Sequence, residues 1–368
     1  MVIKKLVNIV CHYSSIYGGN FIPSILYFAN ENSFKYKIMF TFPVQAKGRS
    51  WANYIEKFGY KVEYIDFSNK SFKKQIKSIN KNNNVNVMYT HFLSGLRVKH
   101  LYMFSKRVKL LIHVHSDFTC GIKRSFVSRL KAFIEHKILR KDAQYIFVSD
   151  AERKKYSNKK YIYLPNALCL ERIPCPKLNY DKFCKDHNIL KTFTLFLTFG
   201  WSPFVKGIDL TVKSFLRCAN ENDRLIVVHG KDDGYKKCID FLCDKIGNVD
   251  FLKDKRIIFI KPEEDIFALY RLCDVFISSS RSEGFSYSIL EALYFNLKVL
   301  SSDIPGVQWS KKYKNVSFFN INNNPELDNL IKDNSGHKKD DKVNSELLND
   351  YDIKKWSAIL SEQFENID

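Results

Sequence analysis

Short, nearly continuous apolar runs recur along the chain and alternate with longer stretches of helical periodicity. The runs are rich in β-branched and aromatic residues, which is typical of strands buried on both faces of a parallel sheet. In the first half of the chain they lie at 6–10, 36–42, 62–65, 85–89, 110–114, 145–148 and 161–164. Strands that alternate with helices in this way predict βαβ units and an α/β fold.

The alternation is interrupted once, near residues 168–186, where Pro174 and Pro176 lie close together and the apolar periodicity is lost. A second series of strand-like runs follows, at 193–199, 224–229, 256–260, 275–278, 298–300 and 316–319, with helical stretches at 205–218 and 287–295. We therefore expect one α/β domain at 1–172, a linker at 173–190 and a second α/β domain at 191–350. The amphipathic tail at 351–368 is predicted to be a helix that packs back on the first domain.

The charged residues are divided unevenly between the two predicted domains. Residues 1–190 hold 34 Lys and Arg against 12 Asp and Glu, whereas residues 191–368 hold 25 against 27. A strongly basic half is drawn to polyanions, such as anionic lipid headgroups, phosphorylated substrates or nucleic acid. No recognised RNA- or DNA-binding module occurs in the sequence, so we expect no nucleic-acid partner.

The chain ends and the cysteines bear on localisation. The first apolar run is too short for a signal peptide, and no apolar stretch of 18 residues exists. Nine cysteines occur without a CxxC pair, which favours reduced thiols. We therefore expect a cytoplasmic protein, with a peripheral position on the inner face of the cell membrane as a further expectation from the basic half.

The strongest chemical signal is the segment 278–293, SSSRSEGFSYSILEAL. A predicted buried strand ends at Ser278 and a helix begins near Ser286, which is the place where α/β folds bind phosphates. The backbone N–H groups near Phe285 and Ser286 favour a diphosphate. Glu283 and Glu291 flank the turn, and a carboxylate can accept hydrogen bonds from two neighbouring sugar hydroxyls. A capped helix with a surface glutamate is the alternative interpretation.

This segment resembles the E-x7-E motif of the retaining GT-B glycosyltransferases of the family-4, or glycosyltransferase group 1, type. The flanking residues 270–277 and 299–306 match the family in the same order. The resemblance implies a GT-B fold, with two Rossmann-like domains facing a central cleft and the donor bound in the second domain. It also implies that Glu283 contacts the donor sugar, that Gly284 belongs to the donor site and that Glu291 holds the nucleotide ribose.

A second signal lies at 199–210, FGWSPFVKGIDL, where another predicted strand ends in Gly200. Lys206 can place a point charge on a phosphate near the helix start. The segment resembles the family's second-domain opening, where the pair equivalent to Lys206 and Gly207 binds the donor diphosphate. The family pattern carries an Arg directly after the first glycine, and here that residue is Trp201. Arg281 is the candidate for a replacement cation.

A glycine pair, Gly18 and Gly19, follows the first predicted strand and lets backbone approach a ligand closely. A tight turn without a binding role is the alternative. The resemblance implies that this loop belongs to the donor site.

Histidines follow two strands of the first domain. Alternation puts His113 and His115 on the same side of a strand, with His115 nearer the end where ligands bind. The resemblance favours His115 as a catalytic residue near the anomeric carbon of the donor, and His91 is a weaker candidate. Two histidines at this spacing can also indicate a metal, but only Asp117 offers a carboxylate nearby. A buried core histidine is the plainest alternative.

The basic stretch 123–141 carries apolar residues at helical spacing. It fits either a core-packed helix with a solvated face or a helix that lies on an anionic membrane.

Together these signals predict a retaining glycosyltransferase. Catalysis is assigned to His115, Lys206 and Glu283, with a nucleoside-diphosphate donor such as a UDP-hexose or UDP-N-acetylhexosamine. The expected acceptor is lipid-linked or an oligosaccharide, in the biosynthesis of a surface polysaccharide such as a capsule or O-antigen. None of the motifs contains an Asp-x-Asp pair, so no metal cofactor is expected. The alternatives are a sugar-nucleotide epimerase of the same fold and a non-catalytic polyanion-binding protein.

Overall fold

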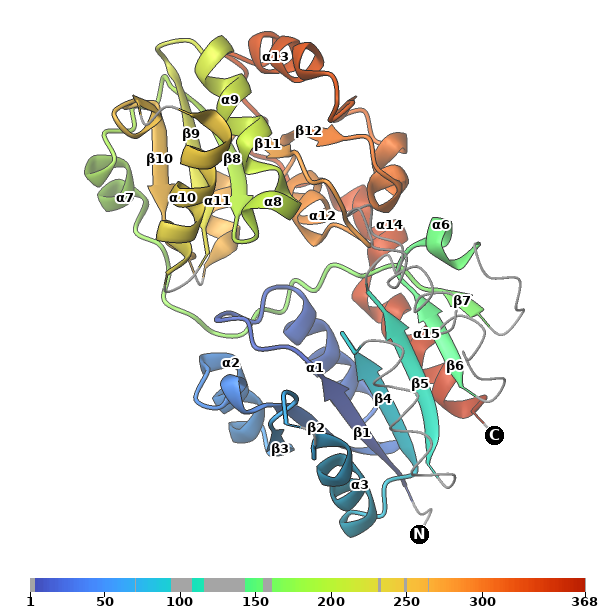
Figure 1. Cartoon of the computed structure of the whole chain (residues 1–368). Helices are drawn as coiled ribbons and strands as arrows, with labels where there is room; N and C mark the ends of the chain where they lie inside the picture. Colours follow the sequence, from blue (N-terminus) through green and yellow to red (C-terminus); the bar gives the residue numbers. More distant parts are fainter. Residues whose placement is uncertain are drawn as a thin grey trace, which may run out of the picture. The chain divides into compact units, whose positions relative to one another are not determined.

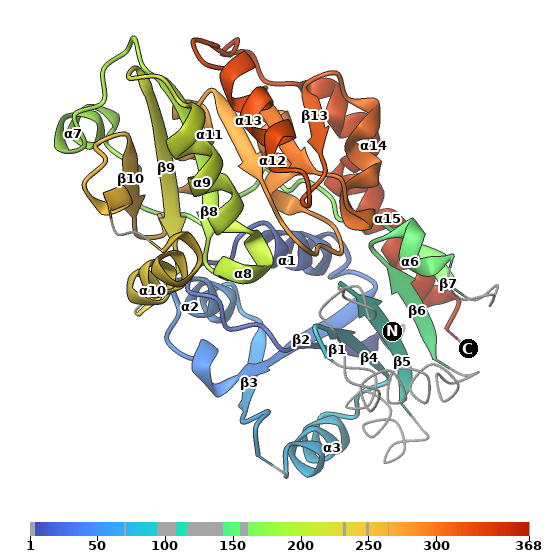
Figure 2. The same ribbon diagram turned by 45° about the horizontal axis from the view of Figure 1, so that its top comes forward.

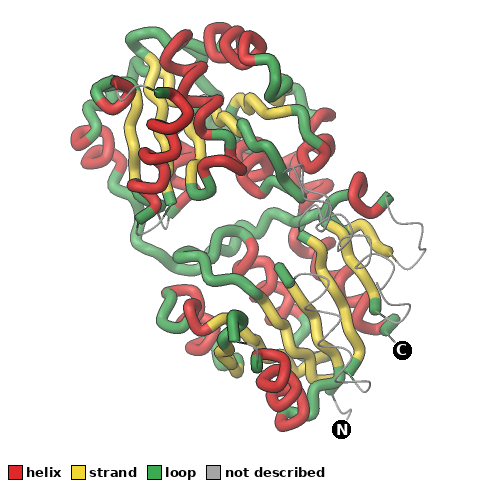
Figure 3. The backbone as a smooth tube through the Cα atoms, in the orientation of Figure 1, coloured by secondary structure: helices red, strands yellow, loops and turns green. Residues whose placement is uncertain are grey.

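The computed structural model describes residues 4–69, 71–93, 108–115, 143–154, 161–230, 233–247, 250–263 and 265–367. The chain forms two compact units (Figure 1). Unit 1 comprises Met1–Ile173 together with Tyr351–Asp368, and unit 2 comprises Pro174–Asp350. Each unit contains one parallel sheet with helices on both faces (Figure 3).

Unit 1 contains seven strands in the order β3-β2-β1-β4-β5-β6-β7. The strands are β1 (Lys5–Cys11), β2 (Tyr36–Pro43), β3 (Lys61–Ile65), β4 (Val87–His91), β5 (Lys109–Val114), β6 (Gln144–Phe147) and β7 (Tyr161–Tyr163). Its described helices include α1 (Phe21–Glu31), α2 (Ser50–Lys57), α3 (Phe72–Asn82), α6 (Asp150–Arg153) and α15 (Ile353–Glu365). The central strands β1, β4 and β5 are almost wholly buried, which explains their continuous apolar runs.

The last helix of the chain, α15, packs on α1 in unit 1. Phe364 stacks on Phe28 with ring centroids 5.3 Å apart, and the Asn32 side-chain amide donates to the Ser357 hydroxyl at 3.1 Å. Trp356 and Phe364 are buried in this contact. Unit 1 is therefore built from both ends of the chain.

Unit 2 contains six strands in the order β10-β9-β8-β11-β12-β13. The strands are β8 (Thr194–Gly200), β9 (Asp223–His229), β10 (Ile257–Ile260), β11 (Val275–Ser278), β12 (Lys298–Ser302) and β13 (Val316–Phe319). The helices α9 (Ile208–Cys218), α10 (Gly234–Ile246) and α13 (Asn324–Asp333) cover one face, and α11 (Ile266–Leu272) and α12 (Tyr287–Tyr294) cover the other (Figure 2).

The predicted α/β fold with two parallel Rossmann-like sheets is confirmed, and the thirteen strands among the described residues lie at or within a few residues of the predicted runs. The single helix predicted at 205–218 is wrong, because Gly207 in the left-handed region separates α8 (Pro203–Lys206) from α9. Within the stretch expected to be a linker, α7 (Tyr180–Asp186) forms a short helix of unit 2. In the part of the chain that the structure describes, no helix is both long and apolar enough to cross a bilayer.

Candidate functional site

The two strongest sequence motifs meet at one edge of the sheet in unit 2. β8 and β11 are parallel neighbours, so their carboxyl ends lie side by side. β8 ends at Gly200 and leads into α8 and α9, and β11 ends at Ser278 and leads through residues 279–286 into α12. The sheet topology therefore brings the motif around Lys206 next to the motif around Glu283.

Lys206 and Glu283 form an ion pair at this edge. The Nζ of Lys206 lies 2.6 Å from Oε1 of Glu283, and the two side chains are only 14% and 12% exposed. The Ser280 hydroxyl donates to the same oxygen at 2.7 Å. Among the described residues, both hydrogen bonds to this carboxylate reach Oε1, so Oε2 keeps acceptor capacity for a ligand hydroxyl.

Two glycines allow the loops that carry this pair to pack closely. A Cβ on Gly207 would lie 2.0 Å from the Ser279 carbonyl oxygen, and a Cβ on Gly306 would lie 2.0 Å from the Glu283 carbonyl oxygen. No side chain larger than hydrogen fits at such distances. Gly200 is less constrained, because its Cβ would meet the Cys238 sulfur at 3.4 Å. The sequence analysis did not identify Gly306 as a site residue, because the loop that it packs against, at Glu283, lies more than twenty positions earlier in the chain.

The start of α12 carries the second glutamate. The Ser286 hydroxyl caps the helix by accepting from the Ile289 N–H at 3.4 Å, and the adjacent Phe285 ring stacks on Trp309 with centroids 4.6 Å apart. Glu291, 6% exposed, accepts a hydrogen bond from the Tyr270 hydroxyl at 3.0 Å. It therefore differs from the surface glutamate of the alternative interpretation. Gly284 lies half-buried in the loop that precedes α12.

Arg281 is engaged by a partner that sequence analysis missed. Its guanidinium forms a bidentate ion pair with Asp209, at 2.8 Å and 2.7 Å, and it also donates to the Phe204 carbonyl at 2.8 Å. Asp209 is 4% exposed, so the pair is largely withdrawn from water. A phosphate would have to share this cation with Asp209.

Trp201 lies beside Lys206, at the position of the family's Arg. Its ring stacks on Phe199 with centroids 4.8 Å apart, and the Lys206 Nζ lies 4.9 Å from the Trp201 ring centroid. The side chain is 50% exposed. The loop thus presents an exposed aromatic face and one lysine, where two cations were expected from the family pattern.

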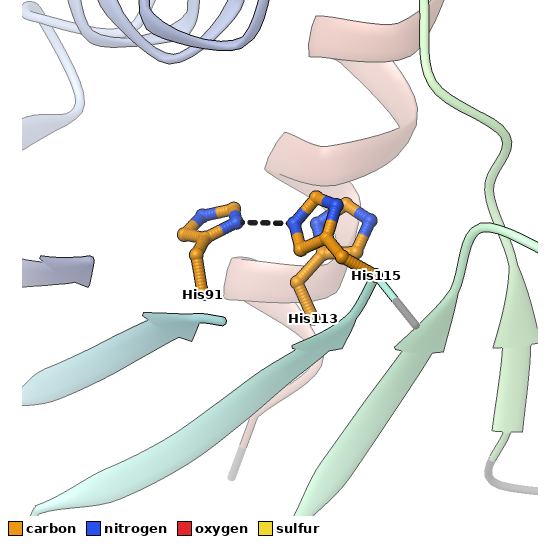
Figure 4. A group of neighbouring side chains, drawn as sticks. All are labelled: His91, His113 and His115. Atoms are coloured by element: carbon orange, nitrogen blue, oxygen red, sulfur yellow. Dashed lines mark hydrogen bonds between the residues drawn. The ribbon is translucent and has the colours of Figure 1, made fainter. Parts of the chain in front are cut away.

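The candidates in unit 1 lie near the ends of β1, β4 and β5. Gly19 has φ +56°, and a Cβ on the buried Gly18 would lie 3.0 Å from the Ile22 Cβ, so the glycine pair forms a tight turn at the start of α1. His115 lies just beyond β5, and its Nε2 is 2.8 Å from Nδ1 of His91 at the end of β4 (Figure 4).

His113 joins the same group, with its Nδ1 2.5 Å from the Tyr89 hydroxyl. Burial lowers the pKa of His91 and of His113 well below the usual value, and the neighbouring imidazoles lower both further. Burial also lowers the pKa of His115 to about 3. The three rings are therefore neutral at pH 7. The basic stretch 123–141 and Asp117 lie outside the described residues.

Two parallel sheets of Rossmann type, each in its own unit, are the arrangement of the GT-B fold. A lysine–glutamate pair lies where two strands of the second sheet end. Residues 179–331 match the sequence profile of the glycosyl transferases group 1. The matched residues lie in the second unit, which therefore contains a group 1 glycosyltransferase domain, as the motif resemblance predicted.

Solved structures share the whole fold at low sequence identity. The structure of Alr3699/HepE from Anabaena in complex with UDP-glucose has a TM-score of 0.77 at 14% identity, covering 98% of this chain and 99% of that one. Sucrose-phosphate synthase from Thermosynechococcus elongatus has a TM-score of 0.75 at 14% identity and covers 99% of both chains. A glycosyltransferase from Rickettsia africae has a TM-score of 0.70 at 14% identity, covering 99% and 98%. No curated protein sequence matches this chain.

Proposed function

We propose that this glycosyltransferase moves a sugar, with retention at the anomeric carbon, from a nucleoside diphosphate to an acceptor hydroxyl. The observation that carries the proposal is the contact between Lys206, at the end of α8, and Glu283, in the loop between β11 and α12. Both side chains are largely withdrawn from water. The Lys206 ammonium can bind a diphosphate, and the Glu283 carboxylate can bind sugar hydroxyls. The similar Anabaena protein was crystallised with UDP-glucose, which favours a UDP-hexose or UDP-N-acetylhexosamine donor here.

Each side chain has a distinct part in this proposal. The leaving diphosphate gains negative charge in the transition state, and Lys206 stabilises that charge more strongly here than in bulk water. Glu283 accepts hydroxyls of the sugar through Oε2, and Glu291, oriented by the Tyr270 hydroxyl, accepts the ribose hydroxyls. His115 is placed near the anomeric carbon by resemblance to the family. A front-side displacement is the mechanism that needs no carboxylate nucleophile.

The donor is proposed to be held without a divalent cation. The Asp-x-Asp triplet of the chain, 350–352, has other partners: Asp350 pairs with Lys312 and with the Tyr313 hydroxyl, and Asp352 caps α15 by accepting from the Lys355 N–H. Transfer is therefore expected to proceed at the same rate when Mg²⁺ and Mn²⁺ are omitted. A rate that rises at least tenfold with either ion would contradict this assignment.

For the acceptor we propose a lipid-linked or oligosaccharide substrate in the assembly of a surface polysaccharide such as a capsule or O-antigen. The excess of positive charge in residues 1–190 supports an acceptor at an anionic membrane surface, and hence a cytoplasmic, peripheral location. A structure with a TM-score of 0.58, the glycosyltransferase WaaG, is described as involved in lipopolysaccharide biosynthesis.

Donor binding is tested first by a thermal-shift series with UDP, GDP, ADP and their sugar conjugates, because a ligand of the native state raises the melting temperature. Lys206→Ala and Glu283→Gln should abolish the shift or the turnover. The matched control is Asp328→Asn, which breaks another ion pair of unit 2, with Arg217 between α9 and α13. Equal loss in the control and the site variants would show that the effect is one of stability alone.

The product separates the proposal from its alternatives. A retaining transferase yields a glycoside only when acceptor is present, whereas an epimerase converts the sugar nucleotide alone. Donor binding without either product would favour a non-catalytic protein.

A further inference from the structure

Three histidines of unit 1 converge where two neighbouring strands end. The register of β4 and β5 pairs His91 with His113, and side-chain alternation returns His115 to the same side two residues later. Figure 4 shows the His91 ring and the His115 ring facing one another, with His113 beside His115. The cluster therefore follows from strand register, and one ring nitrogen of each histidine lies within 4.8 Å of the other two.

These distances are close to those of a three-histidine zinc site. Zinc binds imidazole nitrogen at about 2.0–2.1 Å, so two ligand nitrogens at a tetrahedral ion are about 3.3 Å apart. The Nδ1 of His91 and the Nε2 of His115 stand 2.8 Å apart and would have to separate by about 0.5 Å. The widest pair would have to close by at most about 1.5 Å from 4.8 Å.

The hydrogen-bonding capacity of the cluster is incompletely used. His91 and His113 are 0% and 2% exposed, yet the Nε2 of each ring has no hydrogen-bond partner among the described residues. Buried polar atoms are normally paired, so the unpaired Nε2 of His113, whose Nδ1 meets Tyr89, points to a missing ligand. The Tyr89 hydroxyl, at 2.5 Å from Nδ1 of His113, occupies the place of the outer partner that metal-binding histidines commonly have.

We propose that His91, His113 and His115 bind one Zn²⁺ ion, with the fourth position open to water or to an oxygen of a ligand. Within the described residues the group contains neither a carboxylate nor a thiolate, so its donor set suits zinc and disfavours Mg²⁺ and Ca²⁺, which take oxygen ligands. The ion joins the ends of β4 and β5, and His115 then serves as a metal ligand in place of the catalytic role that the resemblance assigned to it. The three histidines belong to unit 1, whereas Lys206 and Glu283 belong to unit 2.

The test measures metal directly in protein produced without a histidine tag. The full chain is stripped with chelator and titrated with Zn²⁺, and its content is measured by mass spectrometry of the metal. The expected result is one tightly bound equivalent per chain. In a parallel sample, Co²⁺ should give the intense visible absorption of a tetrahedral nitrogen-ligated site. Less than a tenth of an equivalent, or only octahedral cobalt, would overturn the proposal and leave a hydrogen-bonded histidine cluster.

Variants locate the bound ion. His115→Ala, at a partly buried position, should weaken zinc binding about 100-fold or more, and Tyr89→Phe about tenfold. The matched control is His187→Ala in unit 2, which should retain the full equivalent. Zinc bound equally well by His115→Ala would place the ion elsewhere and refute the assignment. UDP binding is measured in the same preparations, so a failure of the donor site is distinguishable from a failure of the zinc site.

Discussion

Replacement of Gly207 tests whether the close packing of the two loops sets the geometry of the donor site. Gly207 joins α8 to α9 at φ +62°, and an added Cβ would lie 2.0 Å from the Ser279 carbonyl oxygen. Ordinary contact begins near 3.4 Å, so Gly207→Ala forces the two loops apart by about 1.4 Å. Those loops carry Lys206 and Glu283, whose charged atoms are 2.6 Å apart.

Two contributions to the loss of stability can be separated. An alanine in the left-handed region costs about 1–2 kcal/mol, and overpacking adds about 1–3 kcal/mol. Gly247→Ala is the matched control, because Gly247 ends α10 at φ +74° and its Cβ would meet nothing within 4 Å. The control should lose only the first contribution, measured as the free energy of unfolding in urea.

Activity gives the decisive comparison. Displacing a positioning group by about 1 Å can lower turnover about 100-fold, so Gly207→Ala should lose about that factor under saturating donor while Gly247→Ala keeps the parental rate. Both rates are measured at a temperature where both variants are folded. If Gly207→Ala matched Gly247→Ala in both unfolding and turnover, the inference that this contact sets the site would be refuted.

Three further outcomes are expected. Trp201→Arg places a second cation beside Lys206. It should tighten UDP binding by up to about fivefold, because an exposed ion pair contributes at most about 1 kcal/mol. An affinity that calorimetry finds unchanged would show that residue 201 does not face the phosphates. Glu291→Gln keeps the side-chain volume but removes the charge. Nucleotide affinity should fall about tenfold, because charge-assisted hydrogen bonds are roughly twice as strong as neutral ones. Binding of the free sugar should be unaffected. The full chain should sediment with anionic vesicles at low salt and be released at high salt, and equal retention on neutral vesicles would contradict a role for the basic residues.

The sequence was most informative about the strands and about the residues near strand ends. Strands buried on both faces leave continuous apolar runs, so β9 was predicted at 224–229 and observed at Asp223–His229. Lys206 and Glu283 were each identified by their place after a predicted strand, whereas the adjacency of β8 and β11 is a finding of the structure. The local pattern alone was enough for these predictions.

The features that depend on distant partners could not be predicted. The break at Gly207 depends on the Ser279 backbone, and the engagement of Arg281 depends on Asp209, 72 positions earlier. Both contacts are set by how α8 and α9 pack against the loop after β11. The three-histidine cluster likewise requires the register of β4 against β5, which no local pattern specifies.

The return of α15 to unit 1 determines the order in which the chain can fold during synthesis. Unit 2 is continuous, so it can fold once residue 350 has left the ribosome. Unit 1 must wait for α15, because Phe28 of α1 lacks its partner Phe364 until that helix has been translated. A nascent chain therefore exposes an apolar surface on its first half until α15 has emerged, and a truncation that removes Phe364 would leave that surface uncovered.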